Sequence, residues 1–339
     1  MSIAPCVIIS KKTVFHLKGI ALGDKEFGFM SKCVSIVCLL CFISASNAFS
    51  AQEVSRNNSG RAATAGWSAF TRAGFVQQMD TDIDGGGSFS VKRFFVQSGT
   101  TYSSGEGNSL SFVVDYRFDS YDFSANSAFG SRQPWDDVHS FRFSIPCRWK
   151  INENWTGVIS PTLRYSATNG IDFNDAVTGG GLAAFSYRYS DRISIGAGLG
   201  LQSQLEDNTQ LIPILLVQWK ITDTLSLQSG RGTGTTPGPG LTLTWQPREK
   251  WSFSIGGSYQ ELRFRLHDKE TVSNGIGEHR SFPIFAGIGY RFNPKAGISL
   301  IGGIEAGGEL SVADSEGRTI IEERHDHALF LGISFSKRF

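Results

Sequence analysis

The fold is decided by residues 141–165, which read FRFSIPCRWKI, NEN and WTGVISPTLRY in succession. In the first part Phe141, Phe143 and Ile145 alternate with Arg142 and Ser144, and the alternation continues over eleven residues. A period of two residues is that of a β-strand, because successive side chains of a strand point to opposite faces. The NEN tripeptide consists of turn-forming residues, after which the same alternation resumes. The stretch therefore predicts an antiparallel hairpin with a tight turn.

The same unit recurs along most of the chain. Clean alternation predicts strands at 110–118, 193–201, 211–221, 225–230, 241–247, 251–259, 282–292, 298–308 and 329–339. Less regular alternation predicts further strands at 68–79, 88–103 and 179–190. With the first hairpin this makes about fourteen strands, within a range of about 12–16. No long amphipathic helical stretch separates them, so the fold class is all-β.

The connections between these strands alternate in length. Those at 152–154, 190–192, 222–224, 248–250 and 293–295 are short, whereas those at 80–87, 125–138, 168–178, 232–240, 267–279 and 311–325 are mostly long and polar. Such alternation is typical of a transmembrane up-and-down antiparallel β-barrel with short periplasmic turns and longer outward loops. A soluble sandwich or jelly roll would not require it.

Composition and aromatic placement agree with a membrane barrel. The mean hydropathy of −0.12 excludes a bundle of membrane helices, and the net charge of +1 is too balanced for a nucleic-acid binder. Trp149, Trp155, Trp219, Trp245 and Trp251 all lie within a few residues of a predicted short turn. They predict an aromatic girdle at one bilayer interface.

The N-terminal region has the pattern of a targeting sequence. Met30-Ser31-Lys32 opens a short positive segment, an apolar run follows, and small residues end at Ala48. We expect translation to start at Met30 and a signal peptide to be cleaved after Ala48. Residues 1–48 would then be an upstream extension plus signal peptide, residues 49–66 a short periplasmic segment, and residues 67–339 the barrel.

The last segment, HALFLGISFSKRF at 327–339, places Phe335 and the terminal Phe339 on one apolar face. It resembles the C-terminal assembly signal of Gram-negative outer-membrane β-barrels. GPGLTLTWQP followed by WSFSIGGSYQELRFRL resembles an uncharacterised, porin-like family of such barrels that carries only a domain of unknown function. The resemblance implies residence in the cell outer membrane, contact with its lipid and insertion by the barrel-assembly machinery. It supplies no catalytic residues.

Polar residues that alternate with the outer apolar ones are expected to line the lumen. The ionisable members of this set are Asp115, Arg117, Asp119, Arg142, Arg148, Lys150, Arg164, Arg291, Glu305, Glu309 and Arg338. Basic side chains outnumber acidic ones, and rings of basic side chains raise the local anion concentration in a pore. The sequence thus predicts a passive channel for small polar or anionic solutes, with mild anion preference. Ion-pair ladders that only brace the wall are an equally good interpretation.

Other functions find weaker support in the sequence. One alternative is a non-conducting structural or surface-recognition barrel whose long loops carry the function. A less favoured one is an outer-membrane hydrolase. Its candidate residues would be Asp82, Asp84, His325, Asp326 and His327, or Ser273 with His279, and Glu322 and Glu323 with the two late histidines would be a weak metal site. Their spacing fits neither chemistry, so we predict no enzyme, cofactor or metal. One sequence does not indicate the oligomeric state.

Overall fold

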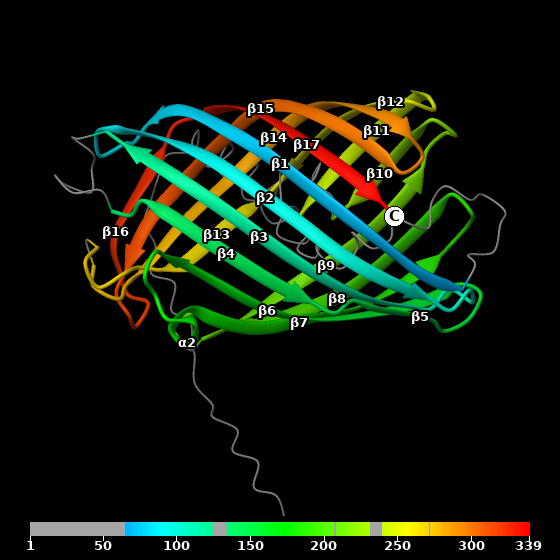
Figure 1. Ribbon diagram of the computed structural model, residues 1–339, viewed down its shortest axis with the longest axis horizontal. Coiled ribbons are helices and arrows are strands. Elements are labelled where there is room, and N and C mark those ends of the chain that lie inside the picture. Colours follow the sequence, from blue (N-terminus) through cyan, green and yellow to red (C-terminus); the bar gives the residue numbers. More distant parts are fainter. Residues whose placement is uncertain (1–64, 125–133, 207, 231–238, 271) are drawn as a thin grey trace, which may run out of the picture. The chain divides into compact units, whose positions relative to one another are not determined.

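The computed structural model describes residues 65–124, 134–206, 208–230, 239–270 and 272–339. Its strands form the wall of a barrel, along which the longer ones run obliquely (Figure 1). The first eight are β1 (Gly66–Asp82), β2 (Ser88–Ser103), β3 (Ser109–Phe123), β4 (Asp137–Ser144), β5 (Cys147–Lys150), β6 (Trp155–Thr168), β7 (Val177–Arg188) and β8 (Ile193–Ser203). The others are β9 (Thr209–Lys220), β10 (Leu225–Ser229), β11 (Gly240–Arg248), β12 (Trp251–Ser258), β13 (Gln260–Arg265), β14 (Ile276–Asn293), β15 (Ala296–Ala313), β16 (Thr319–His325) and β17 (Ala328–Arg338). A short helix, α2 (Phe173–Ala176), lies between β6 and β7.

These segments form a closed antiparallel barrel of fourteen wall strands. Three wall strands are interrupted, so that β4 continues as β5, β12 as β13, and β16 as β17. The barrel closes where β1 pairs with β17, from Phe70 opposite Arg338 to Gln78 opposite Phe330. Figure 1 shows β17, β1, β2 and β3 side by side along this part of the wall. The predicted fold class and strand number are confirmed.

Two of the predicted long loops are wrong in extent. The segment 267–279 gives way to β14 at Ile276, and the segment 311–325 contains the end of β15 and all of β16. Pairing continues here because β14 and β15 stay in register up to Ile276 opposite Ala313. Charged residues occupy these strand ends, so the apolar alternation that marks the rest of the wall is lost although the backbone hydrogen bonds persist.

The outer surface of the wall is apolar and has aromatic side chains at the short-turn end. Trp155 packs against Tyr187 with ring centroids 5.0 Å apart, and Trp251 packs against Tyr290 at 4.8 Å. Large side chains such as Ile255 are exposed on the same surface. In the parts of the chain that the structure describes, no helix has the length and apolar character to cross a membrane. The exposed apolar surface with its aromatic girdle suits strands that face lipid.

At the long-loop end the wall narrows, because β13 leaves the circumference and crosses to β6. Arg265 of β13 forms a parallel bridge to Ala167 of β6. At this level the described strands β1, β2, β3, β4, β6, β13, β14, β15 and β16 make a smaller ring, completed by the bridge between Ile83 and His325. Strands β7 to β11 lie outside it. The long-loop end of the barrel therefore has two compartments separated by β13.

Candidate functional site: the barrel lumen

An apolar cluster fills the smaller ring at the long-loop end. It consists of Ile83, Phe89, Val91, Tyr121, Phe123, Trp135, Val138, Leu262, Phe264, Leu266, Leu310 and Val312, and is called the plug below. Trp135 is fully buried, and its ring meets Phe264 edge-on at 5.2 Å and Phe123 at 5.5 Å. Such close-packed aromatic rings leave no space for water. The lumen is thus closed along the barrel axis at this end.

A buried ionic layer lies next to the plug, on the side that faces the short-turn end of the barrel. Arg93 contacts Glu305, and its Nε is 3.3 Å from Asp119, whose other oxygen is 2.6 Å from Arg117 Nε. Gln78 accepts a further hydrogen bond from Arg93 at 2.9 Å. Asp119 and Glu305 are essentially inaccessible to solvent. With two guanidinium groups and two carboxylates the layer is neutral, as buried charges must be if they are not to destabilise the fold.

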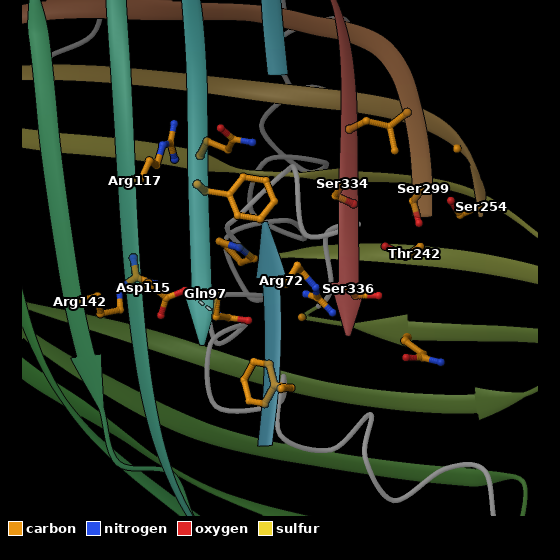
Figure 2. Close-up of a pocket in the computed structure, with 18 of the residues that line it drawn as sticks. Arg72, Gln97, Asp115, Arg117, Arg142, Thr242, Ser254, Ser299, Ser334 and Ser336 are labelled. Carbon is orange, nitrogen blue, oxygen red and sulfur yellow. Dashed lines mark hydrogen bonds between the residues drawn. The ribbon is translucent and has the colours of Figure 1, made fainter. Parts of the chain in front are cut away.

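Below this layer lies a polar cavity of about 1040 Å³, called the chamber here. Cross-strand register places Arg72, Gln97, Asp115, Arg142 and Arg164 in one row on adjacent strands of its wall. Figure 2 shows four of them around the cavity. Gln97 donates a hydrogen bond to Asp115 at 2.5 Å. We call these five residues the arginine row.

The composition of the row is unusual for a wall that is merely braced. Arg142 and Arg164 are direct cross-strand partners, and like charges in such positions destabilise a sheet. Neither makes a salt bridge with a carboxylate of the described chain, whereas Asp115 is the row's single acidic member. The row therefore presents a net positive charge to the chamber.

The row continues beyond Arg72 as a wall of hydroxyl groups. Ser336 pairs with Arg72, and Ser299 pairs with Ser334 of the same strand as Ser336. Figure 2 shows these serines with Ser254 and Thr242 around the cavity. Hydroxyl groups donate and accept hydrogen bonds without adding charge. One part of the chamber wall is thus basic and the other neutral and polar.

Basic side chains dominate the chamber lining as a whole, by twelve to three. The basic ones are Arg72, Arg93, Arg117, Arg142, Arg164, Lys220, Lys250, Arg263, Arg291, Lys295, Lys337 and Arg338, and the acidic ones are Asp115, Asp223 and Glu261. Lys220, Lys250 and Lys295 lie in or beside short turns. The excess positive charge therefore extends from the arginine row to the short-turn mouth.

The residues predicted from sequence to line a pore separate into three groups. Asp115, Arg117, Arg142, Arg164, Arg291 and Arg338 lie on the chamber wall. Asp119 and Glu305 belong to the buried ionic layer, and Glu309 pairs with Arg280 at 2.9 Å beside the plug. Arg148 and Lys150 lie at the short-turn end outside the chamber lining, where Lys150 pairs with Glu153 at 2.7 Å. The predicted residues thus lie at different levels of the barrel, and only some of them face the chamber.

The residues of the hydrolase alternative do meet at the seam but form no catalytic arrangement. The amide of Asp326 donates to the carbonyl of Asp82 at 3.0 Å, while His325 points inward and lies against Phe89. His279 is buried beside the Tyr121 hydroxyl at 3.1 Å, away from the exposed Ser273. Among the residues with described positions, no group of three or more His, Cys, Asp or Glu could hold a metal.

Sequence reasoning missed Arg72, Arg93 and Arg263. Arg93 lies in the run KRFFV, where two charged and two aromatic residues are adjacent and hide the alternation. Arg72 lies in a segment of similarly weak alternation. Arg263 follows the predicted end of a strand at Tyr259, although ELRFRL alternates cleanly and could have been assigned to a strand.

The terminal aromatic residues of the proposed assembly signal lie in the seam strand. Phe335 is paired with Ala73 on one side and Ile298 on the other, and its ring is exposed on the outer wall. The amide of Phe339 donates to the carbonyl of Ala69 at 2.9 Å. The C-terminal strand therefore makes the pairing that closes the barrel.

One protein family matches the middle of the chain. Residues 120–229 match the family described as Domain of unknown function (DUF6268), which spans β3 to β10. No curated protein sequence matches the chain significantly.

Solved structures of outer-membrane channels are similar at low sequence identity. A FadL homologue from Pseudomonas aeruginosa is 10% identical, with 80% of this chain and 90% of that chain covered and a TM-score of 0.46. An outer-membrane channel from Pseudomonas putida F1 is 9% identical, with 83% and 99% covered and a TM-score of 0.45. The P. putida toluene transporter TodX is 10% identical, with 82% and 91% covered and a TM-score of 0.42.

Proposed function

We propose that the protein is an outer-membrane channel that takes up small hydrophilic solutes and prefers anions. The observation that carries the proposal is the excess of basic side chains in the chamber lining. Arg93, Arg117 and Arg263 are paired with carboxylates that lie outside the lining, and nine basic and three acidic residues remain. A wall of this composition attracts anions and repels cations before any specific contact is made. Outward-facing apolar side chains and the aromatic girdle support a position of the chamber across the membrane.

The arginine row is the part of the chamber that favours transport over simple bracing. Bracing charges are paired, as Arg93 and Arg117 are with Glu305 and Asp119. Arg142 has the acidic Asp115 as one cross-strand neighbour and Arg164 as the other, and the contact between like charges has a cost in stability. A carboxylate or phosphate group that enters the chamber offsets this repulsion and forms charge-assisted hydrogen bonds with the guanidinium groups.

A non-conducting surface-recognition barrel is the second candidate, and the plug is the observation that favours it. Residues from four separate chain segments, including Phe89, Trp135 and Phe264, close the barrel axis below the long loops. A barrel whose function lies in its loops would need a stable end to hold those loops, and it would not need a passage for solutes. The two candidates differ in one measurable property, the ionic current across a bilayer.

The test is electrical recording from the purified full-length protein in planar bilayers under a salt gradient. We expect the reversal potential to be shifted from zero toward the equilibrium potential of the anion. Arg142→Gln and Arg164→Gln together should move it toward zero, because they remove two of the charges in the row. Arg318→Gln is the control for loss of a positive charge away from the chamber, since Arg318 lies in the β15–β16 turn and is exposed. Cation selectivity, or no current from a correctly folded barrel, would overturn the proposal.

A further inference from the structure

β13 has two chemically different faces. Leu262 and Phe264 point into the plug and are buried there. The alternate residues Glu261, Arg263 and Arg265 must point the opposite way, because neighbouring residues of a strand face opposite sides. A strand of the membrane wall would turn one of its faces to lipid. β13 crosses the lumen and has protein on both sides, so it acts as a partition.

The partition is fixed at its far end. The amide of His267 donates to the Thr168 hydroxyl at 3.0 Å beside the bridge between β13 and β6. Arg265 donates to the carbonyls of Leu205 at 2.7 Å and Asp175 at 3.0 Å. These contacts join β13 to α2 and to the loop that connects β8 to β9. The charged face of β13 thus looks into a compartment bounded by that loop.

This second compartment adjoins the chamber. It is a polar cavity of about 390 Å³, and Gln204, Gln210, Tyr259, Glu261 and Arg263 line both it and the chamber. At its other side lie Asn208 and Thr209, which are exposed at the long-loop end. None of the plug residues lines it. In the described part of the chain, polar groups therefore connect the chamber to the outward surface around the plug.

One ion pair joins the two sides of this connection. Arg263 of β13 is 2.7 Å from Glu206 of the β8–β9 loop and 3.2 Å from Glu278 of β14. Among described partners, Nε of Arg263 and Oε2 of Glu206 lack hydrogen bonds although both atoms are buried. A pair with unsatisfied buried atoms is less tightly held than a fully satisfied one, so separating it costs less.

We propose that solute passes between the chamber and the outward surface through this side passage, with the Arg263–Glu206 pair as its constriction. The plug is then a permanent closure of the barrel axis. Solute has to pass the charged face of β13, and parting of Glu206 from Arg263 opens the way. This route rests on the proposed channel function, because only a conducting channel has solute and current that pass along it.

The experiment joins the two sides of the constriction reversibly. Cysteines replace Glu206 and Arg263 in a Cys147→Ser background, and the folded barrel is treated in the bilayer with a short bifunctional thiol reagent that contains a reducible bond. The control pair replaces Lys150 and Glu153, whose charged atoms are also 2.7 Å apart but lie outside both cavities. We expect the 206–263 cross-link to lower the current about tenfold or more and reductant to restore it, since cross-linking holds the proposed constriction closed.

The outcomes distinguish the route from the channel function. A cross-linked 206–263 pair that leaves the current unchanged, in a barrel that conducts before treatment, refutes the route and leaves the channel function standing. A barrel without current before treatment refutes the channel function and the route with it. Loss of current from the 150–153 pair as well would show a general effect of cross-linking and would also count against the route.

A second variant needs no cross-link. Glu206→Gln keeps the shape of the side chain but removes the charge that holds Arg263, so the passage should open more often and the mean current should rise about twofold or more. Glu153→Gln, the same change at an exposed position outside both cavities, is the control and should leave the current unchanged. An unchanged current in Glu206→Gln would contradict the assigned constriction.

Discussion

The buried ionic layer allows a quantitative test of the lumen structure. Glu305 is 1% exposed and contacts Arg93, which is 5% exposed. Glu305→Gln leaves the layer with one uncompensated positive charge. Removing one partner of a buried ion pair costs about 3–5 kcal/mol. We expect the lower end, about 3 kcal/mol, because Asp119 at 3.3 Å and Gln78 at 2.9 Å still contact Arg93.

The assay is equilibrium unfolding by urea in lipid vesicles, followed by tryptophan fluorescence. With a slope of about 1–3 kcal/mol per molar urea, the midpoint should fall by about 1–3 M. Glu153→Gln is the control. Glu153 is 83% exposed in its pair with Lys150, so we expect no resolvable change in the midpoint. If the two variants shifted the midpoint equally, the layer would not be the desolvated network described above.

A double variant checks the charge balance itself. Arg93→Met combined with Glu305→Gln removes one charge of each sign and leaves Arg117 paired with Asp119, whose charged atoms are 2.6 Å apart. The combined loss of unfolding free energy should be clearly smaller than the sum of the two single losses. Each single variant leaves one buried charge without an opposite charge to compensate it, whereas the double variant leaves no uncompensated charge. Additive losses would contradict this explanation.

Three further predictions follow from packing and charge. Gly303→Ala should prevent barrel assembly, because the added Cβ would lie 2.0 Å from the Ile284 carbonyl oxygen. The assay is the heat-modifiable gel band of the folded barrel, which should be lost. Gly302→Ala is the control and should assemble, because the nearest neighbour of its Cβ is a flexible side chain. Phe264→Ala should lower the unfolding free energy by about 3–5 kcal/mol in the urea assay, because it leaves a cavity in the plug. A loss of unfolding free energy no larger than that caused by the same substitution at an exposed phenylalanine would contradict a packed plug. Asp136 is exposed, and partial desolvation together with the nearby carboxylates of Asp137 and Asp122 raises the pKa of its carboxyl. Its stabilising contribution is therefore lost as pH rises through the folded-state pKa, so Asp136→Asn should raise the melting temperature at neutral pH and leave it unchanged under acidic conditions where Asp136 is protonated.

The wall of the barrel was predictable because its signals are local. Alternation from Phe141 to Ile151 needs only the chain itself to show which side chains share a face, and the short turn at 152–154 shows that the next strand runs back. The number of wall strands, their approximate limits and the girdle follow from such signals. So does the inward orientation of Arg142 and Arg164, which alternate with apolar neighbours.

The contents of the lumen were not predictable, because alternation gives a side chain its face but not its height along the axis or its partner. Glu305 and Arg93 lie 212 residues apart in sequence and meet only through the strand register and the closure of β17 on β1. Glu261, Leu262 and Arg263 alternate like residues of any wall strand. Nevertheless β13 crosses the lumen, because it pairs with β14 on one side and forms a bridge to Ala167 of β6 on the other. Sequence alone therefore determined a polar-lined membrane barrel. Only long-range pairing decided that its axis is plugged and which polar residues flank the passage that we propose.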